Sequence, residues 1–490
     1  MFKIPTQTQV LVIGGGPAGS TAATLLAREG LEVTLLEKAH FPRYHIGESL
    51  LPTILPILDV LGAREKIESL GFQRKSGAYL EWGPEQWVLN FGELSGNCTY
   101  AFQVTRAEFD QGLLEHSRSQ GVTVVEGVSV DALEFEGERP VAARWSVRAD
   151  GNGAGETGRV AFKYLIDASG RSGLLATRYL ANRRYHKVFQ NIALWGYWKD
   201  ADRMATGREG DIAVSSISDG WLWAIPLHDG TMSVGVVMHK DTVRSKRPVD
   251  LETIYREAIA SSNMVRDIVA PGQLVSAVQS EQDYSYASQR FCGPGYFMVG
   301  DAACFLDPLL SSGVHLATYS ALIAAASLAS VERGEIALEQ ASSFFEKCYR
   351  QAYLRFLVFL SAFYDVGRTK ESYFWEAQRL THEEVSSTDL HRAFLHLVTG
   401  LTDLSDARSE DMRHLVLEEM TKRVDENLTL RKDKSALATL EGEDRQVAAA
   451  NARFFTSVEG LFALNEEEAF DGLYVKTSPR LGLARAQSSS

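Results

Sequence analysis

A glycine-rich run near the N-terminus has the spacing of a turn that binds a dinucleotide. The letters GGGPAG place Gly14, Gly16 and Gly19 in a GxGxxG pattern that also contains Pro17 and Ala18. The first glycine of such a turn permits a sharp change of direction, the second lets the backbone approach a pyrophosphate, and the third allows a helix to pack closely on a strand. A helix that begins at this turn directs its amino terminus at the phosphate charge.

The elements that must position this turn follow from the neighbouring residues. Residues 10–13 form an apolar run that predicts a strand buried on both faces, and residues 17–28 carry small and apolar side chains at helical spacing. A second predicted strand, 33–36, leads to Glu37, where a carboxylate accepts the ribose hydroxyls of an adenosine. A chance glycine loop would lack this fixed spacing of two strands, a helix and an acid. The motif alone does not distinguish FAD from NAD as the bound cofactor.

Charge and cysteine content limit the classes of function. The chain has 490 residues and a net charge of −13, and an acidic surface disfavours nucleic acid as a partner. The four cysteines have no CxxC spacing, so we expect reduced thiols and no metal site.

The longest candidate for a membrane span, 356–364, is well below the roughly 18 apolar residues that a span needs. The N-terminus lacks the pattern of a signal peptide, so we expect a cytoplasmic protein without a membrane partner.

Three later segments resemble the FAD-dependent monooxygenase superfamily. The letters GYFMVGDAAC surround Asp301, DASG begins at Asp167, and Arg106 follows FQ at the start of a predicted helix. The resemblance implies that Asp301 meets the sugar chain of FAD and that Arg106 contacts the flavin. No second GxGxxG occurs, which suggests that a separate flavin reductase supplies the reduced flavin. The alternative is that NADPH binds transiently without a Rossmann unit.

Further motifs resemble the flavin-dependent halogenases, across about the first 400 residues. The letters WLWAIP at 221–226 match the WxWxIP signature of that family, and FLDPLLSSG at 305–313 matches its F..P..S.G signature. The letters FPRYHIGESLLP at 41–52 resemble the branch that acts on phenolic or pyrrolic rings. Substrates of that branch are often tethered to a carrier protein.

The resemblance also assigns a catalytic residue, Lys75. It implies that reduced flavin and O2 oxidise chloride or bromide to hypohalous acid, which crosses a protected tunnel to this lysine. The amine then captures the halogen as a haloamine, or the ammonium holds the acid by a hydrogen bond, and either role needs a desolvated lysine rather than a guanidinium. From its spacing alone, Lys75 would be a solvated surface lysine.

The remaining site residues are implied by the same resemblance. The halide is expected at the backbone of Ser311, Ser312 and Gly313, before a helix near Val314; the alternative is a helix cap without an ion. The expected tunnel and flavin-side residues are Trp221, Trp223, Ile225, Pro226, Phe305 and Pro308. The expected cofactor-binding residues are Gly14, Gly16, Pro17, Ala18, Gly19, Glu37, Lys38, Arg43, Ser49, Arg106, Asp301 and Gly313.

Three residue roles stay open at this point. The paired tryptophans 221 and 223 either keep substrate away from the flavin or simply pack a core. Glu48 is either a proton acceptor for the ring intermediate or a carboxylate at a helix start. His315 either titrates near the flavin or is a core histidine with satisfied hydrogen bonds.

The predicted architecture is α/β: a single-Rossmann FAD-binding fold of the aromatic hydroxylase type, with an antiparallel-sheet substrate domain and a C-terminal helical region. We expect the FAD-binding domain at 1–185 and again at 286–335, with strands 75–100 on the substrate side. The substrate domain spans 186–285 and the helical region 336–490, in which 477–490 is expected to be a frayed tail.

The predicted activity is FADH2-dependent halogenation of an electron-rich phenolic, tyrosyl or pyrrolic ring in natural-product biosynthesis. It uses O2 and chloride or bromide, a flavin reductase as partner, and a substrate that is free or bound to a carrier protein. One alternative is an FAD-dependent aromatic hydroxylase that uses NAD(P)H. Another is a non-catalytic flavoprotein that binds a carrier protein, which the intact glycine motif and Lys75 argue against.

Overall fold

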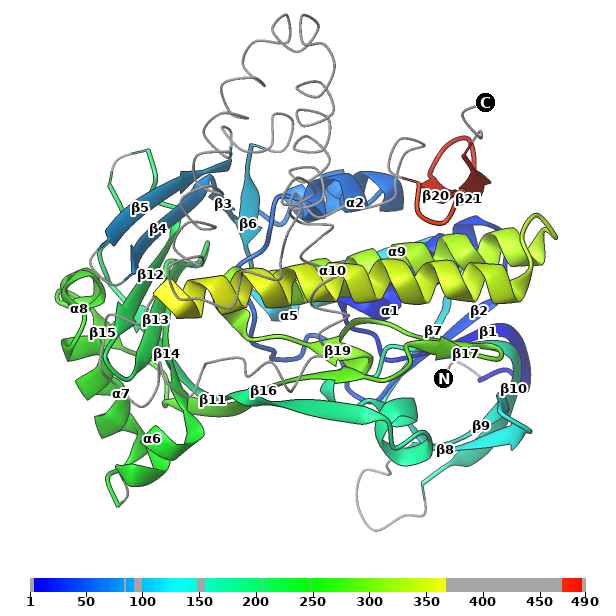
Figure 1. Cartoon of the computed structure of the whole chain (residues 1–490), viewed down its shortest axis with the longest axis horizontal. Coiled ribbons are helices and arrows are strands. Elements are labelled where there is room, and N and C mark those ends of the chain that lie inside the picture. Colours follow the sequence, from blue (N-terminus) through cyan, green and yellow to red (C-terminus); the bar gives the residue numbers. More distant parts are fainter. Residues whose placement is uncertain are drawn as a thin grey trace, which may run out of the picture.

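Two β-sheets and a group of core helices organise the chain (Figure 1). The computed structural model describes residues 4–82, 85–91, 99–147, 155–205, 207–246, 248–366 and 469–486. The eight-stranded sheet contains the predicted nucleotide-binding unit, and the nine-stranded sheet lies beside it. The observed architecture is the predicted mixed α/β fold.

The eight-stranded sheet is parallel in its centre, in the order β17-β18-β10-β1-β2-β7. Its strands are β1 (Gln7–Ile13), β2 (Val33–Glu37), β7 (Thr123–Glu126), β8 (Val128–Glu136), β9 (Arg139–Val147), β10 (Thr157–Asp167), β17 (Cys292–Gly293) and β18 (Tyr296–Met298). Ile13 pairs with Asp167 on one side and Leu36 on the other, and Asp167 pairs with Met298. Parallel strands end at a common edge, so the segments that follow β1, β10 and β18 meet there.

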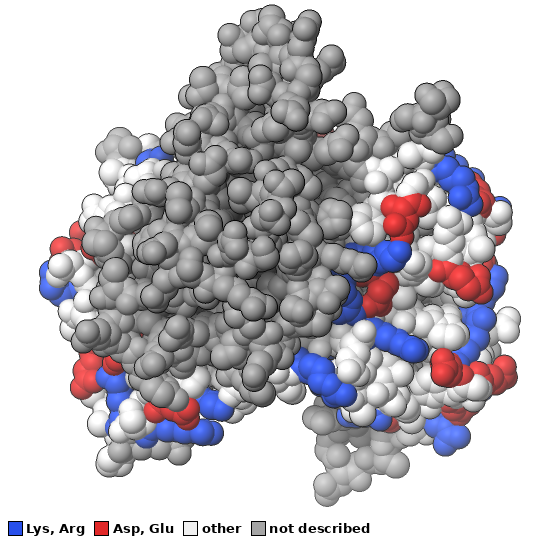
Figure 2. Space-filling model, viewed as in Figure 1, with Lys and Arg blue, Asp and Glu red and all other residues white. Residues whose placement is uncertain are grey.

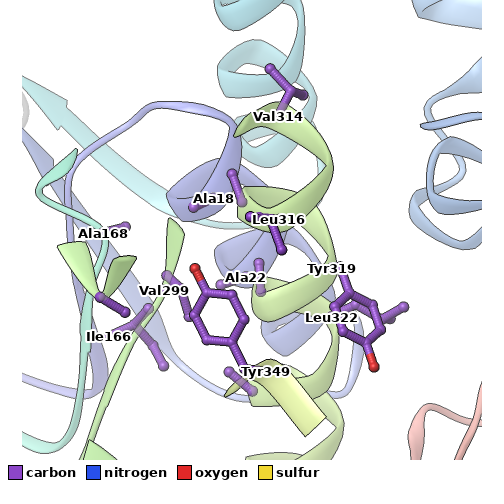
Figure 3. Close-up of a cluster of buried hydrophobic side chains, with 14 of the residues drawn as sticks. Ala18, Ala22, Ile166, Ala168, Val299, Val314, Leu316, Tyr319, Leu322 and Tyr349 are labelled. Atoms are coloured by element: carbon purple, nitrogen blue, oxygen red, sulfur yellow. The ribbon is translucent and has the colours of Figure 1, made fainter. Parts of the chain in front are cut away.

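Helices cover this sheet, among them α1 (Pro17–Arg28), α5 (Arg106–Ser119), α9 (Ser312–Glu332) and α10 (Leu338–Val366). Figure 3 shows Ala18 and Ala22 of α1 beside Leu316 of α9, where small side chains let the two helices approach closely. The helix α9 is long and apolar enough to cross a membrane by composition, but 94% of its most apolar window is buried inside the protein. The expectation that 356–364 is the longest apolar segment is therefore wrong, because the core helix α9 is longer.

The nine-stranded sheet runs in the order β19-β16-β11-β14-β13-β12-β4-β5, with β15 beside β11. Its strands are β4 (Gly77–Trp82), β5 (Glu85–Asn90), β11 (Arg183–Lys199), β12 (Ile212–Ile217), β13 (Gly220–Pro226), β14 (Met232–His239), β15 (Gln273–Leu274), β16 (Gln279–Ser288) and β19 (Cys304–Phe305). All neighbouring pairs are antiparallel except β4 and β12. This arrangement confirms the predicted antiparallel sheet and places the strands after residue 75 at its edge.

The two faces of the nine-stranded sheet have different partners. The helices α6 (Lys240–Ser245), α7 (Leu251–Ala260) and α8 (Asn263–Val269) lie against one face, where Leu222 and Ala224 of β13 are buried. Trp221, Trp223 and Ile225 alternate with them and belong to the core shared with the eight-stranded sheet. The period of two along β13 therefore points both tryptophans toward the nucleotide-binding side.

Short elements connect the two sheets: α2 (Ile54–Leu61), α3 (Arg64–Glu68), β3 (Gln73–Lys75) and β6 (Ala101–Gln103). The strands β3 and β6 form an antiparallel pair in which Lys75 lies opposite Ala101. The predicted helix that carries Arg106 is observed as α5, which begins at Arg106 because residues 101–103 pair with β3. This small pair positions the predicted catalytic lysine.

The end of the chain differs from the expected frayed tail. The strands β20 (Leu473–Lys476) and β21 (Gly482–Arg485) form a hairpin against α9, where the Leu483 N–H donates to Ser330 Oγ at 2.8 Å. Arg333, directly after α9, donates to the Leu481 carbonyl oxygen at 2.8 Å. Leucines 481 and 483 are buried, which orders a segment expected to be loose. Of the predicted C-terminal helical region, α10 is observed, and 367–468 lies outside the described residues.

The charged side chains on the described part of one molecular face are mixed. Figure 2 shows Lys and Arg interspersed with Asp and Glu there, without one sign dominating. On this part of the surface, the overall negative charge is therefore not gathered into a single acidic patch.

Candidate active site

The glycine turn between β1 and α1 has the geometry that its spacing predicts. Gly14 has φ +106°, and a Cβ atom on it would lie 2.3 Å from the Ala168 carbonyl oxygen. A Cβ atom on Gly19 would lie 1.8 Å from the Gly14 carbonyl oxygen. Gly16 caps α1, and Pro17 is its first residue. Larger residues at 14 and 19 would therefore separate α1 from the sheet edge.

The Glu37 carboxylate is fixed beside this turn. Its Oε2 accepts the Gly15 N–H at 2.6 Å, and its Oε1 accepts the Ala39 N–H at 2.8 Å. The side chain is buried, whereas the neighbouring Lys38 is exposed. Glu37 thus lies at the end of β2, where the fold places the ribose-binding acid, and Lys38 lies on the surface next to it.

Two arginines converge near the amino terminus of α1 through one buried acid. Arg106 donates from Nε and Nη2 to the two Asp110 oxygens at 2.8 and 3.0 Å, and Arg43 Nη2 lies 3.3 Å from Asp110 Oδ2. Arg43 Nη2 would also lie 3.3 Å from a Cβ atom on Gly16. Among the described residues, the buried Arg43 Nη1 has no hydrogen-bond partner. An orphaned guanidinium N–H beside a helix amino terminus fits a pyrophosphate.

Asp301 lies at the same sheet edge, in the turn that follows β18. Its carboxyl is half-buried, and burial raises its pKa to about 6, against the opposing effect of the guanidinium groups of Arg171, Arg106 and Arg183. Asp167, at the end of β10, accepts the Ser169 and Leu175 N–H groups at 3.0 and 2.8 Å. Asp167 therefore shapes its own loop, while Asp301 remains accessible at the sheet edge near Arg106.

Together, these residues fit FAD. The glycine turn, Glu37 and Arg43 would hold the adenosine and the pyrophosphate, and Asp301 and Arg106 would lie along the path toward the ring. Reduced FAD supplies the electrons with which O2 is activated.

The predicted halide segment forms the entrance to α9. Ser311 has φ +54°, in the left-handed region, and its N–H donates to the Pro308 carbonyl oxygen at 2.9 Å. Asp307 fixes the preceding turn, because it accepts the Leu309 N–H at 3.1 Å and the Asn191 amide at 2.8 Å. The backbone before α9 is thus held by buried hydrogen bonds.

An open space lies in front of this entrance. Gly313 is exposed, and a Cβ atom on it would have no described atom within 4 Å outside its immediate chain neighbours, whereas Ser312 is buried. The first N–H groups of a helix have no partner within the helix. Gly313 thus lies at an exposed start of α9 beside open space, and binding of an anion there stays a prediction.

Lys75 is buried at the end of β3, with only 2% of its surface exposed. Its Nζ donates to Ser49 Oγ at 2.8 Å and to the Leu50 carbonyl oxygen at 3.2 Å, and it lies 5.2 Å from the centre of the Phe91 ring. Burial lowers the pKa of this amine to about 7, against a smaller opposing effect of Asp211. The expectation of a solvated lysine from spacing alone is wrong, and the desolvated lysine is what the chemistry requires.

Asp211, whose charge raises the pKa of Lys75, is itself bonded to other groups. Its Oδ1 accepts the Ser76 N–H at 2.8 Å, and its Oδ2 pairs with Arg208 at 2.6 Å. The carboxylate is fully buried. Because Arg208 compensates much of its charge, Asp211 does not restore the ordinary pKa of the lysine.

An extended segment, 48–50, contacts Lys75 on one side and β11 of the nine-stranded sheet on the other. The Glu48 carbonyl oxygen accepts the Val104 N–H at 2.8 Å, and the Leu50 N–H donates to the Phe102 carbonyl oxygen at 3.0 Å. Successive side chains of an extended segment point to opposite faces. Ser49 therefore faces Lys75, and Glu48 faces β11, where the Tyr197 hydroxyl donates to Glu48 Oε1 at 2.7 Å. Ser49, predicted to contact the cofactor, accepts a hydrogen bond from Lys75 through its Oγ in this structure.

The two signature tryptophans form a buried pair on β13. Their ring centres are 5.9 Å apart with planes at 50°, and Trp223 Nε1 lies 3.3 Å from Ser233 Oγ. A Cβ atom on Gly235 would lie 2.1 Å from the Trp223 ring, so a glycine on β14 makes room for the indole. Ile225 and Pro226 continue the buried strand, as expected. Burial accounts for a packing role, and shielding of the flavin stays a prediction.

The other predicted residues fall into two groups. Phe305 and Pro308 are half-buried in the segment that leads to the halide turn. His315 is buried on α9, its Nδ1 lies 2.8 Å from Thr53 Oγ1, and its ring stacks on Tyr319. These contacts place His315 in the core, and its titration near the flavin stays a prediction.

Sequence reasoning missed one network. Trp195 Nε1 donates to the Tyr44 hydroxyl at 2.6 Å, and the hydroxyls of Tyr44 and Tyr197 lie 2.9 Å apart. These contacts join residues about 150 positions apart in the chain, so no local pattern indicates them.

Metal chemistry has no site within the described ranges. No group of three His, Cys, Asp or Glu side chains there can hold a metal ion, and cysteines 292, 304 and 348 are buried. Cys98 lies outside the described residues.

Comparison with known proteins identifies the family of this chain. The chain matches the tryptophan halogenase family over residues 9–99 and 93–410. It is 47% identical to a tryptophan 2-halogenase of Chondromyces crocatus, over 99% of this chain and 95% of that protein. It is 39% identical to the sulochrin halogenase gedL of Aspergillus terreus, over 74% and 70% of the two chains.

Solved structures that resemble this chain are also halogenases. The myxobacterial chondrochloren halogenase CndH, described as an FAD-dependent halogenase, superposes with a TM-score of 0.72 at 36% identity, covering 82% of this chain and 92% of CndH. The flavin-dependent halogenase CmlS superposes with a TM-score of 0.71 at 33% identity, covering 86% of this chain and 79% of CmlS. With its glycine turn, its sheet-edge acid and its buried lysine in place, this chain belongs to the family of flavin-dependent halogenases.

Proposed function

We propose that this enzyme transfers an oxidised halogen from the flavin site to the Lys75 amine, and from there to an electron-rich aromatic ring. The observation that carries the proposal is the burial of Lys75, whose pKa is lowered to about 7 by loss of solvent. At that pKa, a large fraction of the lysine is a neutral amine near neutral pH. An amine with an ordinary pKa would be almost entirely charged and unable to attack a halogen.

The transfer balances without a further reactant. Hypohalous acid and the amine give a haloamine and water, forming an N–X bond and breaking the O–X bond. The aromatic ring then takes the halogen from nitrogen, and its displaced proton returns to the amine. Ser49 Oγ and the Leu50 carbonyl oxygen, at 2.8 and 3.2 Å, hold Nζ in one orientation throughout. The Phe91 ring helps to exclude water, which would otherwise consume the oxidant.

The halide is proposed to bind at the amino terminus of α9, at residues 311–313. The open space at Gly313 and the fixed turn around Asp307 support this placement. Chloride and bromide both suit a site built from backbone N–H groups.

The proposed substrate is a ring activated by a heteroatom: a phenol, a tyrosyl group or a pyrrole. Electrophilic substitution favours such rings because the heteroatom stabilises the cationic intermediate. The relative named tryptophan 2-halogenase supports the pyrrole type, since position 2 of an indole belongs to its five-membered ring. We propose a cytoplasmic enzyme of natural-product biosynthesis, with FADH2 supplied by a separate reductase and with the ring presented free or on a carrier protein.

The test is a substrate panel read by mass spectrometry. Purified enzyme, FAD, a flavin reductase, NADH and chloride or bromide are incubated with free and carrier-bound pyrrole, indole and phenol compounds. The proposal expects a halogenated product from at least one of these rings and none when halide is left out. Hydroxylated product formed with NADPH alone, without halide, would instead support the aromatic hydroxylase alternative.

A further inference from the structure

A chain of hydrogen bonds links the surface to a buried acid on the face of segment 48–50 opposite Lys75. The Tyr44 and Tyr197 hydroxyls lie 2.9 Å apart, and the Tyr197 hydroxyl donates to Glu48 Oε1 at 2.7 Å. Tyr44 is 50% exposed, whereas Glu48 is 3% exposed. The path therefore runs from a half-exposed tyrosine to a buried carboxyl group through only two side chains.

The donor direction along this path is fixed by chemistry. Trp195 Nε1 can only donate, and it donates to the Tyr44 hydroxyl oxygen at 2.6 Å. The single Tyr197 proton goes to Glu48, so the single Tyr44 proton must go to Tyr197. Every hydroxyl proton in the chain thus points inward, toward the carboxyl group.

The inner end faces the side of the molecule where the flavin is expected. The Ser233 hydroxyl lowers the pKa of the Glu48 carboxyl group and accepts a hydrogen bond from Trp223 Nε1 at 3.3 Å. Arg106, which donates to the Gly47 carbonyl oxygen at 3.3 Å, acts on the same carboxyl group by its charge. Glu48 therefore lies between the signature tryptophan and the flavin arginine.

The established reaction consumes a proton. One reduced flavin, one O2, one halide ion, one aromatic C–H and one proton give oxidised flavin, one C–X bond and two waters. A site closed to water, as a reactive oxidant requires, cannot take that proton directly from solvent. It needs a built path.

We propose that Tyr44, Tyr197 and Glu48 form a proton relay that delivers the consumed proton from solvent to the flavin side of the active site. The protonated Glu48 gives its proton to an oxygen that leaves as water. Tyr197 then gives its proton to Glu48, Tyr44 gives its own to Tyr197, and water at the surface reprotonates Tyr44. One proton moves inward, and rotation of the two hydroxyl groups and of the carboxyl group then restores the original hydrogen bonds.

The charges around Glu48 suit this role. Burial raises the pKa of Glu48 to about 7, against the opposing effects of Ser233, Tyr197 and Arg106, while Asp229 adds to the rise. A carboxyl group with such a pKa both gives and takes a proton near neutral pH. Burial also raises the pKa of both tyrosines, so the relay hydroxyls stay neutral between transfers.

Tyr255 provides a matched control. Its hydroxyl is also buried and bonded, accepting Trp198 Nε1 at 2.8 Å and donating to the Val234 carbonyl oxygen at 3.0 Å, but it lies on the face of the sheet covered by α7. Tyr255→Phe therefore removes a buried hydroxyl of α7 that bonds to the other face of the same sheet, without touching the relay.

The first measurement uses the flavin-free protein and needs no turnover. Infrared spectroscopy should show a buried carboxylic acid band that disappears as pH rises through about 7 and that is missing in Glu48→Gln. Because the Tyr197 hydroxyl stabilises the charged carboxylate, Tyr197→Phe should move this midpoint to higher pH. Tyr255→Phe should leave it unchanged. A band absent from the wild type, or a midpoint unaffected by Tyr197→Phe, overturns the relay.

The second measurement follows halide-dependent oxidation of bound FADH2 by absorbance, without an aromatic substrate, so it does not depend on the proposed substrate class. Tyr44→Phe, Tyr197→Phe and Glu48→Gln should slow this reaction roughly tenfold or more above pH 7, where Glu48 must be recharged with protons. Circular dichroism confirms folding, and the exposed Tyr44 offers the mildest variant. Rates and pH profiles that match Tyr255→Phe overturn the proposal.

Discussion

The amine of Lys75 lies 2.8 Å from the hydroxyl of Ser49, on one face of an extended segment whose other face carries Glu48. One short stretch of backbone thus holds the proposed halogen carrier and the proposed proton donor on opposite sides. The same stretch is fixed by its pairing with β6. Lys75 and Glu48 can act separately because the hydrogen-bonded backbone of segment 48–50 lies between them.

Asp211→Asn should shift the pH dependence of halogenation. The Asp211 charge raises the pKa of Lys75, so its removal should lower that pKa below about 7 while the amide keeps the Ser76 contact. The midpoint of rate against pH should move to lower pH, as measured by product formation between pH 5 and 9. The exposed acid Asp200, changed to Asn, is the control. A midpoint equal to that control would mean that Lys75 does not set the profile.

Arg43→Ala should weaken FAD binding more than folding. The side chain holds a buried N–H without a described partner beside Gly16, and a charged hydrogen bond to phosphate contributes about 1.5–3 kcal/mol. We expect the Kd for FAD to rise about tenfold to a hundredfold, as measured by fluorescence quenching. Arg144→Ala, at an exposed arginine of β9, should leave the Kd unchanged. Equal Kd values for the two variants would remove Arg43 from the cofactor site.

Gly313→Ala should separate ligand binding from stability. The added methyl group meets no described protein atom, and alanine stabilises a helix by roughly 0.5–1 kcal/mol relative to glycine. The unfolding temperature of the flavin-free protein should therefore not fall, whereas the halide KM or the FAD Kd should rise because the methyl group enters their space. Unchanged binding of both ligands would show that the open space serves neither.

The nucleotide-binding unit was predictable because its information is local. Gly14, Gly19 and Glu37 lie within one βαβ unit, and each is required by backbone geometry that the spacing already expresses. The face of β13 that carries Trp221 and Trp223 followed from the period of two. Sequence patterns of this kind report contacts between near neighbours.

Other features depend on tertiary contacts that no local pattern records. The sequence around Lys75 predicts a surface lysine, but in the folded chain β6 and segment 48–50 bury it. The relay joins Tyr44 to Tyr197 across 153 positions. The hairpin β20–β21 has polar and turn-forming residues in its sequence. Its order depends on Leu483, which is buried against α9.

The most direct test of the account compares Lys75→Ala, Lys75→Arg and the control Lys199→Ala, an exposed lysine at the end of β11. Each variant is assayed with FADH2, O2 and halide for two quantities: the rate of flavin oxidation and the amount of halogenated product by mass spectrometry. The account predicts that both Lys75 variants oxidise flavin at close to the wild-type rate but form no halogenated product, while Lys199→Ala forms it normally. Halogenated product from Lys75→Ala at a rate near that of Lys199→Ala would contradict the central role of this amine.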